Sequence, residues 1–118
     1  MLGDKPDIQE RIKAEADAVF EDEITYEKIS KLKYTEAVIK ETLRIIPTSP
    51  VTGRLCVKES ELLGHKIIPG MTIILNFFSV HHDPENFENP TVFNPERWLG
   101  EKPNDGYFFP FGAGPKTW

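Results

Sequence analysis

The stretch KLKYTEAVIKETLRIIP, residues 31–47, carries the clearest structural signal in the chain. Its side chains alternate between apolar and charged with helical spacing, which predicts an amphipathic helix from about Lys31 to Ile46. Pro47 cannot continue such a helix and sets its end. One side of this helix would carry the following residues: Thr35, Ile39, Thr42, Leu43 and Ile46.

Glu41 and Arg44 lie three residues apart in this stretch. On a helix they occupy neighbouring positions of one face, so that they can form an ion pair. An exposed pair of this kind is common and contributes only about 0.3–0.5 kcal/mol. Spacing alone leaves open whether the pair is exposed or buried.

Upstream of this stretch, a second amphipathic helix is predicted from about Pro6. Proline is well suited to the first helical position, and apolar residues recur at helical spacing with charged residues between them. The apolar positions are Ile8, Ile12, Ala16 and Phe20.

Downstream of Pro50 the pattern changes to short β-branched and apolar runs, which are typical of strands. Turn signals at Gly64 and at Pro69-Gly70 separate these runs and favour a small antiparallel sheet. Strand-like residues are Leu55, Val57, Ile67 and the run 72–75. The predicted fold class is therefore α+β.

Residues 81–110 contain five prolines with several Asn and Asp residues, so regular structure is not expected there. A loop this long inside a compact domain is usually functional, and three aromatic residues within it indicate that it packs against the core. These are Phe87, Phe93 and Trp98.

Composition limits the function classes. The 118 residues make at most one small domain, and the net charge of −5 argues against nucleic-acid binding. Cys56, the only cysteine, excludes an intrachain disulfide and is predicted to be a small buried hydrophobic residue in a strand. No apolar run reaches the roughly 20 residues of a transmembrane helix, and neither a secretory signal nor a localisation is readable.

Histidines give no prediction of a metal site. His65 is isolated, and His81-His82 followed by Asp83 is more typical of a solvated loop than of a set of metal ligands.

Two further segments stand out near the C-terminus. In PERW, residues 95–98, Arg97 could reach a distant carboxylate with two-pronged geometry. In FFPFGAGPKT, residues 108–117, aromatic residues lead into a glycine-rich turn that a flat cofactor could approach closely. The turn lacks the spacing of a phosphate-binding loop.

Taken in order, these motifs closely resemble the cytochrome P450 family. Glu41 and Arg44 match its Glu-x-x-Arg helix, and Arg97 matches the arginine of its Pro-Glu-Arg-Phe type of motif. The family pattern Phe-x-x-Gly-x-Arg-x-Cys begins at Phe111 and includes Gly114, with Lys116 as the basic residue. Trp118 then stands at the position of the iron-ligating cysteine. The segments 6–9 and 81–84 also resemble parts of the family.

The resemblance implies roles for these residues. Glu41, Arg44 and Arg97 would form a buried structural network, and Arg54 and Lys116 would bind haem propionates, with Phe111 and Gly114 in the haem loop. None is implied to be catalytic, and no metal ligand is implied because Trp118 replaces the cysteine. The implied regions are helices at 1–50, a small sheet at 51–80, and a meander with a haem-loop remnant at 81–118.

By the same resemblance, the parent protein would bind haem, receive electrons from a reductase or ferredoxin, and insert one oxygen atom of dioxygen into a small organic substrate. This chain would be a fragment that begins after the family's oxygen-activating helix and is inactive alone. The alternative is a noncatalytic interaction module derived from the family, which requires the chain to fold by itself.

Overall fold

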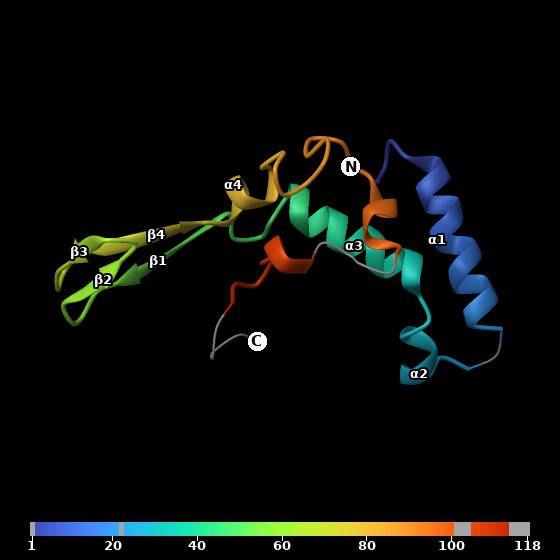
Figure 1. Cartoon of the computed structure of the whole chain (residues 1–118). Helices are drawn as coiled ribbons and strands as arrows, with labels where there is room; N and C mark the ends of the chain where they lie inside the picture. Colours follow the sequence, from blue (N-terminus) through green and yellow to red (C-terminus); the bar gives the residue numbers. More distant parts are fainter. Residues whose placement is uncertain (1, 22, 101–104, 114–118) are drawn as a thin grey trace.

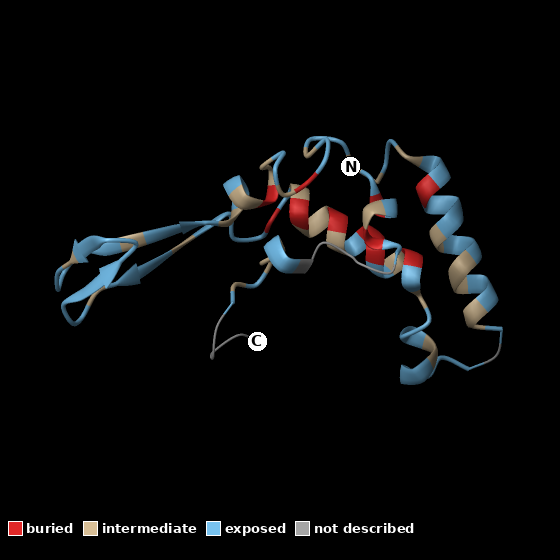
Figure 2. Cartoon of the chain, in the orientation of Figure 1, coloured by how far each residue is buried: buried red, intermediate tan, exposed pale blue. Residues whose placement is uncertain are grey.

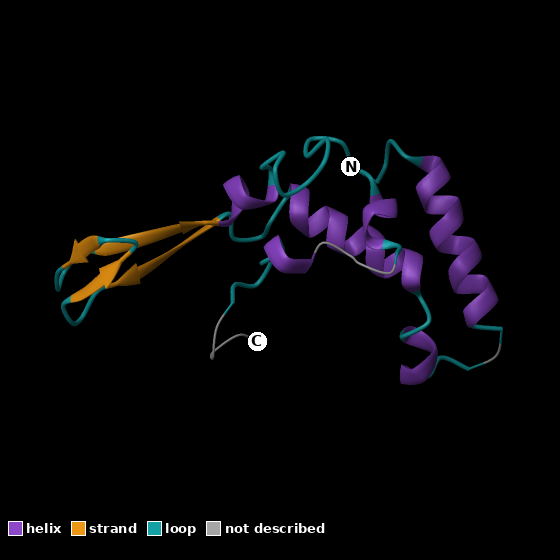
Figure 3. Ribbon diagram, in the orientation of Figure 1, coloured by secondary structure: helices purple, strands orange, loops and turns teal. Residues whose placement is uncertain are grey.

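The computed structural model describes residues 2–21, 23–100 and 105–113, and it has an α+β fold (Figures 1 and 3). Three helices come first: α1 (Pro6–Val19), α2 (Tyr26–Ile29) and α3 (Lys33–Ile45). Four short strands follow: β1 (Val51–Leu55), β2 (Ser60–Leu62), β3 (His65–Ile67) and β4 (Thr72–Asn76). The rest holds the short helix α4 (Phe77–His81) and two 3₁₀ turns, η1 (Pro95–Trp98) and η2 (Asp105–Tyr107).

The strands form an arm that projects from the helical part of the molecule (Figure 1). The molecule measures 58 × 31 × 28 Å, and its radius of gyration is 18.4 Å. A compact domain of this length would have a radius of gyration of roughly 13–14 Å. Most strand residues are exposed, as Figure 2 shows, so the arm has no core of its own.

The arm contains two antiparallel ladders rather than a single sheet. β1 pairs with β4 from Val51 opposite Asn76 to Leu55 opposite Thr72, and β2 pairs with β3 beyond them. The predicted turns occur at Gly64, with φ of 78°, and at Gly70, with φ of 92°, a backbone region that glycine adopts without strain. Cys56 follows β1 directly and is partly buried.

α1 packs against α3 through the predicted apolar positions near its start. Ile8 is buried with Tyr34 and Val38 of α3, and Ile12 packs against this cluster. The prediction of a helix from Pro6 is confirmed, since α1 begins there.

α3 is confirmed within two residues at its start and one at its end, but its buried side differs from the apolar side expected from the sequence. Ile39 and Ile46 are 55% and 60% exposed. The buried residues are Tyr34, Ala37, Val38, Glu41 and Arg44. The reason is that residues 81–98 wrap around the side that carries the charged pair.

The irregular segment packs down through its aromatic residues, as predicted. Phe87 and Trp98 are 2% and 6% exposed and form a second cluster with Ala37, while Phe93 packs against the first cluster. Phe108 packs against the second cluster as well. After His81, which ends α4, the regular structure in this segment is limited to η1 and η2 among its described residues. None of the described helices is long and apolar enough to cross a bilayer.

The start of α3 is capped from a distance. Leu32 at the N-cap offers no side-chain acceptor, and Glu15 of α1 takes its place. Its carboxylate accepts hydrogen bonds from the backbone N–H of Tyr34 at 2.7 Å and of Thr35 at 2.8 Å, and from the Thr35 hydroxyl at 2.7 Å. These contacts satisfy two amides that the helix leaves open and fix the angle between α1 and α3.

Replacing Glu15 by Ala is expected to lower the free energy of unfolding by about 0.5–2 kcal/mol, the range for loss of a capping side chain. Urea unfolding followed by circular dichroism measures the change. Glu10→Ala, on the exposed part of the same helix, serves as the matched control. Equal effects of the two substitutions would contradict the capping role.

Candidate functional site

Glu41 is the acceptor at the centre of the site, and its side chain is fully buried. Its Oε1 accepts hydrogen bonds from Arg44 Nη2 at 2.9 Å, from the Asn94 backbone N–H at 2.9 Å and from Arg97 Nε at 3.1 Å. Its Oε2 accepts from Arg44 Nε and from Trp98 Nε1, both at 2.9 Å. One carboxylate therefore joins α3 to three residues of the distant segment 94–98.

Arg44 extends this network to the start of the irregular segment. Besides its two-pronged contact with Glu41, its Nη1 donates to the backbone carbonyls of His81 and Pro90, both at 2.7 Å. Its guanidinium lies over the Phe87 ring, 5.2 Å from the centroid, and its side chain is fully buried. Because these bonds satisfy the buried cation on several sides, Arg44 holds the irregular segment against α3.

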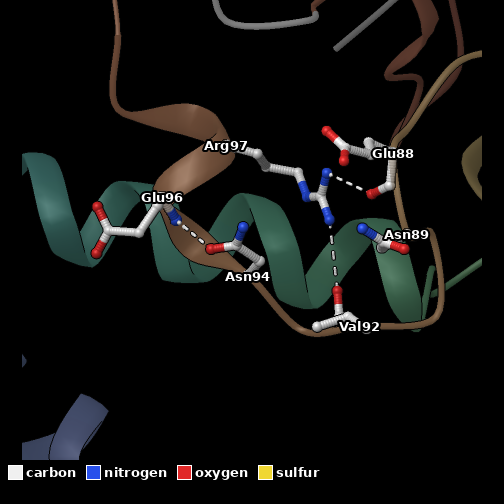
Figure 4. Close-up of a pocket in the computed structure, with 6 residues that line it drawn as sticks. All are labelled: Glu88, Asn89, Val92, Asn94, Glu96 and Arg97. Atoms are coloured by element: carbon white, nitrogen blue, oxygen red, sulfur yellow. Dashed lines mark hydrogen bonds between the residues drawn. The ribbon is translucent and has the colours of Figure 1, made fainter.

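Arg97 lies at the edge of the network with 14% of its side chain exposed. Its Nη1 donates to the Glu88 carbonyl at 3.1 Å, and its Nη2 to the Val92 carbonyl at 3.5 Å (Figure 4). A cavity of about 390 Å³ lies beside it, lined by Glu88, Asn89, Val92, Asn94, Glu96 and Arg97. The structure thus brings Glu41, Arg44 and Arg97 into one connected group.

The electrostatic state of Glu41 follows from these contacts. Burial raises the pKa of its carboxyl, but the hydrogen bonds from Arg44, from the Asn94 amide and from the Trp98 indole outweigh burial and leave the pKa below its ordinary value. Glu41 is therefore the charged partner of both arginines at neutral pH.

His81 was expected in a solvated loop, and that expectation is wrong. It is the last residue of α4, and its side chain is fully buried. Its Nε2 accepts the backbone N–H of Phe109 at 2.9 Å. Burial, and then the neighbouring positive charge of Arg44, lowers the pKa of its imidazole.

Acidification is expected to weaken the fold in two steps. Because the pKa of His81 is lowered by burial from 6.5, the unfolded chain binds a proton first, and stability falls as pH drops from 6.5 toward the folded value. Because the pKa of Glu41 lies below 4.5, its contribution is complete above 4.5 and is lost as pH falls through the folded value.

Urea unfolding at a series of pH values measures both steps. His81→Phe is expected to remove the first step. Glu41→Gln is expected to reduce the second, in which Glu15 also takes part. Burial raises the pKa of the Glu15 carboxyl, but hydrogen bonds from Thr35 and Tyr34 outweigh burial and hold this pKa below its ordinary value. A stability that stays constant as pH falls below 6.5 would contradict the buried neutral state of His81, and one that shows no further loss below pH 4.5 would contradict the buried charged state of Glu41.

Arg54 lies in β1 and faces the glycine-rich turn. It lines a cavity of about 240 Å³ together with Phe77, Phe111 and Gly112 among others, and a second of about 210 Å³ with Phe109 and Ala113. Its Nη1 donates to Thr52 Oγ1 at 3.2 Å and to the Gly53 carbonyl at 3.0 Å. Within the described ranges no ion pair of Arg54 is present.

An apolar groove lies between α3 and the same turn. It has a volume of about 470 Å³ and includes Ile39, Leu43, Phe108 and Phe111 in its lining. Phe111 is 65% exposed, so its ring offers open apolar surface to both this groove and the Arg54 cavity.

Three predicted site residues, Gly114, Lys116 and Trp118, lie outside the described residues. In the part of the chain that is described, no group of three or more His, Cys, Asp or Glu side chains could hold a metal ion.

Comparison with known proteins identifies the family. The family model described as Cytochrome P450 matches residues 1–117 of the chain. The chain belongs to the cytochrome P450 family. The Glu41 network and the Arg54 cavity therefore lie within the part of the chain that matches the cytochrome P450 family.

Individual cytochrome P450 relatives match over nearly the whole chain. It is 39% identical over 97% of its length to cyclooctat-9-en-7-ol 5-monooxygenase of Streptomyces melanosporofaciens, and 40% identical over 98% to putative cytochrome P450 CYP13A3 of Caenorhabditis elegans. It is 35% identical over 99% of its length to cytochrome P450 4V2 of Homo sapiens. The chain spans 26%, 24% and 23% of the lengths of these relatives, respectively.

Sequence reasoning missed three members of the site: the Trp98 indole, the Asn94 amide and His81. Trp98 was predicted to pack, but its hydrogen bond to Glu41 spans 57 positions in the chain and has no local signal. His81 could have been found from its place next to the irregular segment. Backbone N–H and C=O groups there have no partners in a helix or sheet, so a nearby polar side chain is needed to bind them.

Proposed function

We propose that this chain is the haem-supporting segment of a longer haem-thiolate monooxygenase. One observation carries the proposal: the buried Glu41 network fixes the irregular segment on α3, while Arg54 and the turn at Phe111 line one cavity. The network serves as scaffold, because both Glu41 and Arg44 are fully enclosed and reach no substrate or cofactor surface.

The described residues fit the carboxylates and the flat face of haem. Arg54 presents a guanidinium, a planar group that binds carboxylates in two-pronged fashion, to a cavity that it shares with Phe111. Gly112 has φ of 83°, a conformation that favours glycine. No atom lies within 4 Å of the position that a β-carbon would occupy there, so the backbone leaves space for a large ligand. We assign Arg54 to one haem propionate and, from its place in the sequence, Lys116 to another, with Phe111 and Gly114 in the haem loop.

When bound through a cysteine thiolate, haem supplies oxygen activation, since the thiolate donates electron density that favours cleavage of the oxygen–oxygen bond. The sequence places Trp118 at this position, and the indole nitrogen is a donor only. We therefore propose that the chain with Trp118 is inactive alone and that its residues hold and orient the cofactor in the parent.

The parent is proposed to take electrons from a reductase or ferredoxin and to act on a small organic substrate. The name of the Streptomyces relative, a 5-monooxygenase of cyclooctat-9-en-7-ol, supports this reaction class.

The second candidate is a noncatalytic interaction module. The observation that favours it is the exposed apolar surface, such as Leu55 at 64%, Ile74 at 61% and Phe111 at 65%. Surface of this kind marks contacts with other protein, either within a longer chain or with a partner. The module requires the isolated 118-residue chain to fold, so the absence of a cooperative thermal transition would exclude it. A folded chain is compatible with both candidates, and haem binding by the longer product then decides between them.

The proposed function is tested on the product of a longer reading frame that carries a cysteine in the haem loop. Its reduced carbon monoxide spectrum is expected to be that of a haem-thiolate protein. Arg54→Ala is expected to lower haem retention, whereas Lys58→Ala, an exposed basic residue in the turn after β1, is the matched control with no expected change. Failure of the longer product to retain haem would overturn the proposal.

A further inference from the structure

We propose that His81 is a positioning residue that fixes the backbone entering the glycine-rich turn and joins it to the Glu41–Arg44 network. The inference rests on the proposed function only in assigning the turn to the haem loop. His81 contacts both sides of this junction: its carbonyl accepts from Arg44 Nη1 at 2.7 Å, and its ring Nε2 accepts the Phe109 N–H at 2.9 Å.

The direction of the second bond sets the protonation state of the ring. A backbone N–H can only donate, so Nε2 must carry a lone pair, and the proton of the neutral ring must be on Nδ1. Nδ1 is buried and has no hydrogen-bond partner among the described residues. The hydrogen bond that Nε2 accepts therefore selects this tautomer, since no hydrogen bond at Nδ1 does so.

The surroundings of the ring keep it neutral. The charged and titratable groups that face it are Arg44 from α3 and His82, the residue that follows α4, and both oppose a positive charge. From the irregular segment and the turn it meets the uncharged rings of Phe87, at 6.5 Å, and Phe108, at 5.5 Å between centroids. Protonation would place an Nε2–H against the Phe109 N–H and break the bond.

The anchored residue lies where the turn meets the Arg54 cavity. Phe109 lines one cavity with Arg54, and its ring lies 6.4 Å from that of Phe77. Phe111, two residues on, lines the other Arg54 cavity. Holding the Phe109 amide therefore fixes the start of the segment that the proposed function assigns to haem.

The test uses nuclear magnetic resonance of the 118-residue chain, with no haem present. Long-range nitrogen–proton correlations of the imidazole rings are expected to show His81 with its proton on Nδ1. The Phe109 amide is expected to be protected from exchange in the wild type and to exchange about tenfold faster, or more, in His81→Phe, which keeps an aromatic ring but has no acceptor.

His82→Phe is the matched control. The His82 ring stacks on Phe78 at 4.0 Å and does not contact Phe109, so Phe109 exchange is expected to stay unchanged. His81→Gln offers a carbonyl acceptor and is expected to recover part of the protection.

Three results would overturn the inference: a His81 proton on Nε2, a Phe109 amide unprotected in the wild type, or equal Phe109 exchange in His81→Phe and the wild type. The tautomer is read from the wild type alone and decides the matter even if His81→Phe does not fold. Because no readout involves haem, failure here is distinct from failure of the haem-binding test.

Discussion

Replacing Glu41 by Gln is expected to lower the free energy of unfolding by about 3–5 kcal/mol. The substitution keeps the shape of the side chain but removes the charge that balances Arg44, which has no exposed surface. It also turns one of the two acceptor atoms into a donor, so that either the Trp98 indole or the Arg97 Nε loses its partner. Urea unfolding at neutral pH measures the effect.

Glu36→Gln is the matched control on the same helix. Glu36 is half exposed and pairs with Lys33 and Lys40 on the surface, so its loss is expected to change stability by no more than about 0.5–1 kcal/mol. If both substitutions had the same small effect, Glu41 would not be the buried centre of the fold.

Replacing Arg44 by Met is expected to have an effect of similar size, about 3–5 kcal/mol. Methionine fills much of the space over Phe87, but it leaves the carbonyls of His81 and Pro90 without their donor and the Glu41 charge with one arginine instead of two. Hydrogen exchange of residues 81–98 is expected to accelerate together with the loss of global stability.

Two further variants make the Arg44 result specific. Arg44→Lys keeps the charge but cannot span both Glu41 oxygens and the carbonyls, so it is expected to fall between wild type and Arg44→Met. Lys13→Met removes a cation from an exposed pair with Asp17 and is expected to change stability by at most about 0.5 kcal/mol. An Arg44→Met protein as stable as Lys13→Met would contradict the network.

The helices and the turns could be predicted because their signals are local. Pro6 and Pro47 set the ends of periodic segments, and Gly64 and Gly70 supply the turn conformations that the strands need. The spacing of Glu41 and Arg44 showed that they are neighbours. Spacing could not show that they are buried, since their enclosure depends on residues 81–98 folding back across α3.

The apolar side of α3 shows why the buried face was harder to predict. Ile39 and Leu43 lie on the predicted apolar side, yet they line an open groove, while two charged residues are enclosed. A charged pair is buried only where partners from elsewhere satisfy every hydrogen-bonding group, and such partners leave no periodic pattern. The family resemblance supplied this information because it places Arg97 beside the helix.

The central claim is that a buried carboxylate on α3 holds the irregular segment, and the Trp98 indole proton reports it most directly. Trp98 Nε1 donates to Glu41 Oε2 at 2.9 Å in the protein interior. In nuclear magnetic resonance spectra, with the signal assigned through Trp98→Phe, this proton is predicted to exchange slowly and to lose its protection in Glu41→Ala, which removes both acceptor atoms. An indole proton that exchanges freely in the wild type would contradict the account.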